Sequence, residues 1–175
     1  MDNTLDTPPR FCQIVDGFIR KSGRTIAWLN VLLIANILIQ VILRYAFNLG
    51  LVWLEELQWH LYGAAIMFAI SYCITEDAHI RLDLLHQRFT PKKKAIIEMI
   101  GILLLLFPLY ITLCVHGVGF VESALRVHER SESPLGLPYR WIIKSAIPVG
   151  MSFVIAASTS RLVRSIAIIF NKKKV

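Results

Sequence analysis

Four long apolar windows, separated by charged connectors, constrain this chain more than any other feature of its sequence. Read between flanking charges, the windows cover residues 25–43, 57–75, 99–121 and 145–160. None of them contains Asp, Glu, Lys or Arg. A helix needs roughly 20 apolar residues to cross a hydrocarbon core of about 30 Å, because no water inside the core can satisfy a free backbone group. The first three windows meet that requirement and predict transmembrane helices.

The fourth window is shorter and needs its flanking residues to cross. Trp141, Ile142 and Ile143 extend it to residues 141–160. The extended span then includes Lys144, whose long side chain can carry its ammonium group to the membrane surface. We therefore expect an all-α membrane protein with four transmembrane helices, over residues 25–43, 57–75, 99–121 and 141–160.

Two further segments have the apolar spacing of amphipathic helices that lie on a membrane surface. In residues 10–22 apolar side chains recur on one helical face, and residues 78–89 show a similar pattern. Pro108 predicts a kink inside the third span. With 175 residues and a mean hydropathy of +0.58, the chain has room for these elements in a single membrane domain over residues 1–175, and for no folded soluble domain besides.

The basic residues bracket the apolar windows. The formal net charge is +7, and most of the 19 Lys and Arg residues precede the first span, follow the last or lie between the second and third. If the N-terminus is placed in the cytoplasm, 14 of the 19 lie on the cytoplasmic side, which the positive-inside rule favours. The charge therefore predicts an N-in/C-in topology in a lipid membrane, with no role in binding nucleic acid.

A polar stripe occupies the first span near its expected outer end. Asn36, Gln40 and Arg44 follow one another at four-residue intervals, so they share one helical face. Because a polar stripe is costly against lipid, we interpret it as a set of contacts with neighbouring helices of an assembly; a substrate or ion path is the alternative. Glu55 and Glu56 open the second span at similar depth, where an ion pair with Arg44 is expected.

Histidines supply the main alternative to an interaction protein. His60 and His116 are expected near the outer ends of two antiparallel spans, and a facing pair could ligate haem in a four-helix redox subunit. His79, Asp83 and His86 have helical spacing for a metal site but lack an evident fourth ligand. The sequence also lacks a nucleophile elbow and a phosphate-binding loop, so it does not favour an enzyme. We expect no bound cofactor and no bound metal.

Three short motifs mark the ends of the first two spans. Arg-Tyr at 44–45 ends the first span, Trp-Leu-Glu-Glu at 53–56 opens the second, and His-Ile-Arg-Leu-Asp at 79–83 follows it. Each motif is short and is weak evidence by itself. Their order, their positions at the ends of spans and the presence of four spans together indicate one family. Over roughly residues 20–165 the chain resembles the small, DctQ-type membrane subunit of tripartite ATP-independent periplasmic (TRAP) transporters.

This resemblance implies a place in a secondary transporter of the bacterial inner membrane. In such a system a periplasmic binding protein delivers an organic acid to a large membrane subunit, which moves it inward with sodium. The small subunit is then a scaffold for the large subunit, with transient contact to the binding protein. The residues expected to contact the partner subunit are Asn36, Gln40, Arg44, Trp53, Glu55, Glu56, His79, Arg81 and Asp83.

Overall fold

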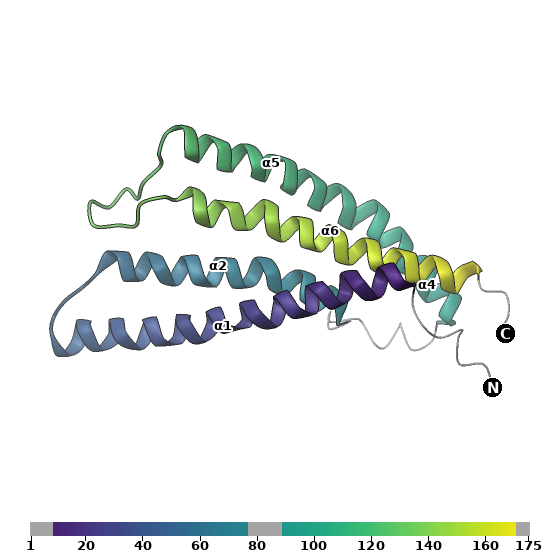
Figure 1. Cartoon of the computed structure of the whole chain (residues 1–175), viewed down its shortest axis with the longest axis horizontal. Helices are drawn as coiled ribbons and strands as arrows, with labels where there is room; N and C mark the ends of the chain where they lie inside the picture. Colours follow the sequence, from purple (N-terminus) through teal and green to yellow (C-terminus); the bar gives the residue numbers. More distant parts are fainter. Residues whose placement is uncertain (1–8, 77–88, 171–175) are drawn as a thin grey trace.

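The helices of the protein follow the apolar windows closely. A computed structural model describes residues 9–76 and 89–170. By length and apolar composition, four helical stretches in this part of the chain can cross a membrane, and each contains one of the expected spans. The all-α prediction is confirmed. Figure 1 shows the elements α1 (Arg10–Ala46), α2 (Val52–Thr75), α4 (Pro91–Gly101), the π-helical segment η2 (Ile102–Leu106), α5 (Phe107–Arg126) and α6 (Trp141–Phe170).

Helix α6 is the centre of the bundle. It packs along α2 on one side and α5 on the other, and near its C-terminal end it also contacts α1 and α4. The start of α1 and the end of α6 lie at the same end of the molecule, which we call the terminal end (Figure 1). Connectors 47–51 and 127–140 lie at the opposite end, which we call the connector end.

The first helix is longer than the first apolar window. Residues 10–22, expected as a separate surface helix, continue without a break into the first span, so that α1 is 37 residues long. Cys12, Asp16 and Ile19 are buried, whereas Phe11 and Phe18 on other faces of the same turns are exposed. The expected surface helix over residues 78–89 falls almost entirely on residues 77–88, which lie outside the described part of the chain.

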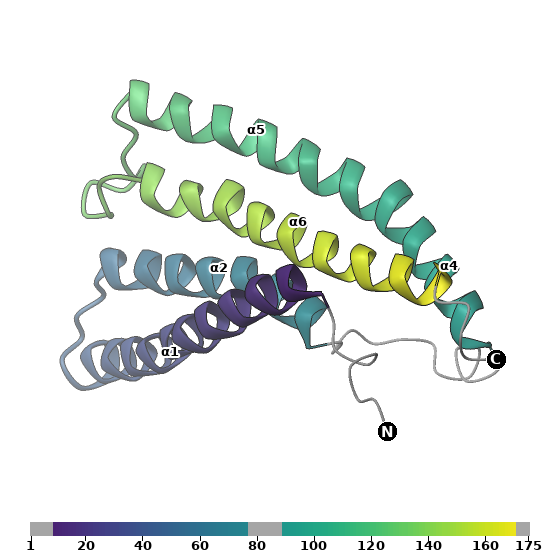
Figure 2. The ribbon, with the colours of Figure 1, turned by 45° about the vertical axis from the view of Figure 1, so that its right-hand side comes forward.

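The distortion expected from Pro108 is present one turn before it. Proline lacks the N–H that would bond to the carbonyl four residues back, and its ring crowds that carbonyl. Residues Ile102–Leu106 form a π-helical segment immediately ahead of the proline. A π segment widens the helix by one residue per turn and so relieves this crowding. Helices α4 and α5 consequently run in different directions on either side of it (Figure 2).

Glycines allow the helices of the bundle to approach closely. A Cβ atom on Gly150 of α6 would lie 2.9 Å from the Cβ of Met67 on α2. A Cβ on Gly117 of α5 would lie 3.2 Å from Pro148 on α6. Membrane helices associate through backbone proximity at small residues, because lipid tails offer no hydrophobic driving force between them. These contacts position α6 between its two neighbours.

The outward faces of α1 and of the third span are apolar and exposed. They carry Trp28, Leu32, Leu38 and Ile42 on α1, and Leu104, Leu105, Leu109, Val115 and Val118 on η2 and α5. A soluble protein of this size does not expose contiguous apolar surfaces along two whole helices. In a bilayer these surfaces face lipid or another membrane protein.

Candidate functional site

The polar stripe of the first span lies against α2 inside the chain. Asn36 and Gln40 are only 6% and 8% exposed. The Asn36 side-chain amide donates to the backbone oxygen of Leu54 at 3.0 Å. The amide of Gln40 donates to Oε1 of Glu55 at 2.8 Å, and its own oxygen accepts a hydrogen bond from Gln58. The stripe therefore joins α1 to α2.

The ion pair expected between Arg44 and the two acidic residues of α2 is absent from the described part of the chain, and that prediction is wrong. The Glu55 carboxylate accepts from Gln40, while the Glu56 carboxylate accepts from Ser131 in the connector over residues 127–140. Adjacent helical residues point about 100° apart, so one arginine cannot reach both carboxylates. Arg44 is exposed and lines a hollow with Tyr45 and Glu55 at the connector end.

Glu56 fastens the long connector to α2. Its carboxylate accepts a hydrogen bond from the Ser131 hydroxyl and a second one, at 2.6 Å, from the backbone N–H of Leu137. A Cβ on Gly136 would overlap Ser131 and would also lie 2.8 Å from Oε1 of Glu56, so a side chain at 136 would disturb the hydrogen bond between these two residues. A half-buried carboxylate with two donors from one loop holds that loop in a fixed position.

Glu129 ties both ends of the same connector to the start of α6. Its carboxylate forms an ion pair with Lys144 and lies 3.9 Å from Arg140. The backbone N–H of Arg140 also donates to the Glu129 carbonyl at 3.3 Å. His128 and Tyr139, each one residue before a member of this pair, have positive φ angles of 46° and 63°. Such angles are unfavourable for residues with a side chain, so surrounding contacts must hold them.

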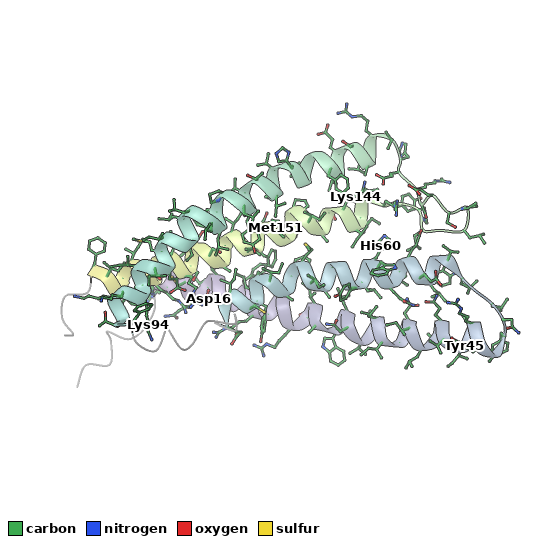
Figure 3. The ribbon with its side chains drawn as sticks, turned by 180° about the vertical axis from the view of Figure 1, so that it is seen from behind. Asp16, Tyr45, His60, Lys94, Lys144 and Met151 are labelled. Carbon is green, nitrogen blue, oxygen red and sulfur yellow. The ribbon has the colours of Figure 1, made fainter. Side chains whose placement is uncertain are left out.

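A second polar cluster joins four elements at the terminal end. Asp16 of α1 forms an ion pair with Arg164 of α6, and Glu98 of α4 forms one with Arg161 of α6. The Arg161 guanidinium also donates to the backbone oxygen of Ile74 in α2 at 3.0 Å. Figure 3 shows Asp16 at this end of the bundle, remote from Tyr45 and Lys144 at the other.

Sequence reasoning missed the terminal cluster and the Glu129 pairs. The partners in the Asp16 and Arg164 pair are 148 residues apart, so no local spacing links them. The one available signal was an isolated acid beside an apolar window, because a charge in such a place needs a partner. Glu98, directly before the third window, is the clearest example. It would have shown that a basic partner is needed, though not which one.

The remaining predicted residues divide between two outcomes. His79, Arg81 and Asp83 fall outside the described residues, as does the metal site considered on His79, Asp83 and His86. Trp53 lies among the described residues and is 41% exposed at the connector end.

The histidine pair required for haem binding is not formed. His60 lies on α2 and His116 on α5, and these helices pack on opposite sides of α6. Nδ1 of His60 lies 2.5 Å from the Glu56 backbone oxygen, and His116 is exposed. Within residues 9–76 and 89–170, no group of three His, Cys, Asp or Glu side chains is arranged to hold a metal ion.

The described structure defines a class of protein: a four-span membrane bundle whose polar side chains mainly connect its own helices. A family model described as "Tripartite ATP-independent periplasmic transporters, DctQ component" matches residues 33–167, which is more than half of the chain. The chain therefore belongs to the DctQ family and is the small membrane component of a TRAP transporter, not an enzyme. No curated protein matches it.

Proposed function

We propose that this chain is a static scaffold for the large membrane subunit of a sodium-coupled transporter for organic acids. In this proposal the complex lies in the bacterial inner membrane, with both ends of this chain in the cytoplasm. A periplasmic binding protein brings the substrate and contacts the complex transiently. The excess of Lys and Arg at the terminal end supports this orientation, since basic residues are retained on the cytoplasmic side.

The scaffold proposal rests on one observation: hydrogen bonds and ion pairs of side chains connect the elements at both ends of the bundle. Glu56 and Glu129 fix the connector end, while the Asp16–Arg164 and Glu98–Arg161 pairs fix the terminal end. A body fixed at both ends is suited to remain still while a partner moves. A transport site, by contrast, requires interrupted helices with free polar groups near the membrane centre.

The exposed apolar faces of α1 and of the third span are the surfaces on which a large partner could pack. Asn36 and Gln40 on α1 are already bonded to α2 and so are not available to the partner. Asn30 on α1 and His116 on α5 are exposed and could form polar contacts with a partner helix in the membrane. Further polar contacts with the partner would come from the exposed connector end, where Arg44, Trp53 and Tyr45 are available.

Reconstitution tests the scaffold proposal directly. The large subunit is incorporated into liposomes with or without this chain, the binding protein is supplied outside, and uptake of the organic acid carried by that binding protein is followed under a sodium gradient. We expect uptake only when the large subunit is present, with a higher rate or a more stable complex when this chain is added. Uptake by this chain without the large subunit would contradict the proposal.

The proposed polar contact is tested by replacing Arg44 with alanine. Arg126→Ala is the matched control, because Arg126 is exposed at the same end and, among the described residues, forms its ion pair with Glu122 of its own helix. We expect Arg44→Ala to weaken association with the large subunit by about tenfold, corresponding to ~1.4 kcal/mol, and the control to leave it unchanged. Equal complex yield and equal uptake for both variants would remove Arg44 from the interface.

A further inference from the structure

A polar cavity of about 170 Å³ lies within the terminal cluster. Residues of α1, α2, α4 and α6 line it, and among the described residues its charged lining consists of two acids, Asp16 and Glu98, and two bases, Arg161 and Arg164. Ser160 and Ser165 add hydroxyl groups from α6. The charges of these described residues balance, and groups of both signs face a space large enough for a small polar group.

Buried donors in this cavity lack partners. Within the described residues, the hydroxyl of Ser160, which is 1% exposed, has no hydrogen-bond partner, and neither has the buried Nε of Arg164. Leaving such a group unsatisfied costs about 1–3 kcal/mol, more if it is charged. Native structures satisfy almost all buried polar groups with protein, water or a ligand. These two donors therefore call for an acceptor that the described chain does not supply.

An apolar groove continues from the cavity. The two spaces share Ile74, Glu98 and Arg161, and the groove of about 330 Å³ is otherwise lined mainly by Ile102, Leu105 and Leu106. At about 1.5 Å per residue, the eight steps from Glu98 to Leu106 extend it about 12 Å along the third span. A polar chamber and an apolar groove thus form one continuous amphipathic space.

The position of this space along the bundle matches the structure of a bilayer. Trp141 begins α6 at the connector end, and Arg161 follows twenty residues later. Twenty helical residues rise about 30 Å, which is the thickness of the hydrocarbon core. The polar cavity therefore lies at headgroup depth on the far side, and the groove runs from it into the hydrocarbon.

We propose that this space binds one phospholipid with a zwitterionic headgroup that carries a phosphate and a primary ammonium group, as in phosphatidylethanolamine. The phosphate oxygens accept hydrogen bonds from Nε of Arg164 and from the Ser160 hydroxyl. The ammonium group lies toward the carboxylates of Asp16 and Glu98, and one acyl chain occupies the groove. A purely anionic headgroup fits less well, because the two carboxylates oppose the attraction of the two arginines.

Native mass spectrometry of the full chain tests this proposal. The protein is released from membranes of equal parts phosphatidylethanolamine and phosphatidylglycerol, and the lipid retained per chain is identified. Ser160→Ala removes an unpartnered donor, and Leu106→Trp fills the groove. The matched controls are Ser152→Ala on an exposed face of α6 and Leu109→Trp on an exposed face of α5. Circular dichroism and elution volume establish that each variant is folded.

We expect wild type and both controls to retain one phosphatidylethanolamine, and each test variant to retain about tenfold less. Absence of retained lipid, equal retention in all folded variants, or preferential retention of phosphatidylglycerol would overturn the proposal. Soluble glycerophosphoethanolamine serves as a probe of the headgroup alone. If glycerophosphoethanolamine competes as strongly as the intact lipid, the groove does not bind an acyl chain, and the proposal of a phospholipid site is wrong.

Discussion

Gly150 is the position where a single added carbon atom should most clearly disturb the bundle. The residue is buried at the contact between α6 and α2. A Cβ atom there would lie 2.9 Å from the Cβ of Met67, 3.1 Å from its backbone oxygen and 3.2 Å from its carbonyl carbon. Two of these atoms belong to the backbone of α2, so no rotation of a side chain can remove the overlap. The Gly150→Ala variant must separate the two helices.

The size of the effect follows from comparison with a second glycine. Overpacking a well-packed interior costs typically 1–3 kcal/mol, while alanine is favoured over glycine inside a helix by about 1 kcal/mol. Gly119 on α5 offers the matched control, because a Cβ there would meet nothing within 4 Å. Since the helix-propensity gain is common to both variants, the difference in their unfolding free energies isolates the overlap. We expect Gly150→Ala to be about 1–3 kcal/mol less stable than Gly119→Ala.

Titration with SDS in mixed micelles measures this difference, with helicity as the readout of unfolding for the full chain. Both variants are compared with wild type at the same detergent mole fractions. We expect Gly119→Ala to unfold at or above the wild-type midpoint and Gly150→Ala to unfold below it. Midpoints that coincide for the two variants would refute the close approach of α6 to α2, on which the position of every element around α6 depends.

Two further substitutions, one of them with a matched control, test the side-chain contacts at the ends of the bundle. Glu56→Ala should release the connector over residues 127–140 from α2 and so increase its rate of cleavage in limited proteolysis. The control Glu122→Ala removes an exposed ion pair within α5 and should leave that rate unchanged. Equal cleavage rates for the two variants would show that the Glu56 carboxylate does not hold the connector. Asp16→Asn should lower the free energy of unfolding by about 1–3 kcal/mol and so shift the SDS midpoint downward. The loss is smaller than for a fully buried ion pair, because Arg164 is 38% exposed. An unchanged midpoint would show that the Asp16–Arg164 pair does not stabilise the fold.

The fold was largely predictable because its main determinant is local. Apolar length and the absence of charge identified four spans, and the spacing of Asn36 and Gln40 placed both on one face. The extent of α1 was less predictable, because basic residues before an apolar window suit either a surface helix or a continuation of the span. The continuous helix forms because Cys12 and Asp16 are buried against α6, and α6 is distant in sequence from both residues.

The candidate site was predictable only in part. Residue types showed that the polar stripe needs hydrogen bonds, but not that α2 of the same chain supplies them. The expected pair between Arg44 and Glu55 failed because Gln40 occupies that carboxylate, a competition that depends on the rotation of two packed helices. Contacts such as Glu56 with Leu137 involve a backbone group in an irregular loop, for which sequence patterns carry little information.

We propose that this chain is a fixed partner of a larger membrane subunit. The most direct measurement is to purify the tagged chain in mild detergent from its native membrane and to identify and quantify the proteins that accompany it by mass spectrometry. We expect one many-span TRAP membrane subunit in constant proportion to this chain. Recovery of the chain without such a subunit, or with redox proteins in its place, would contradict the scaffold function.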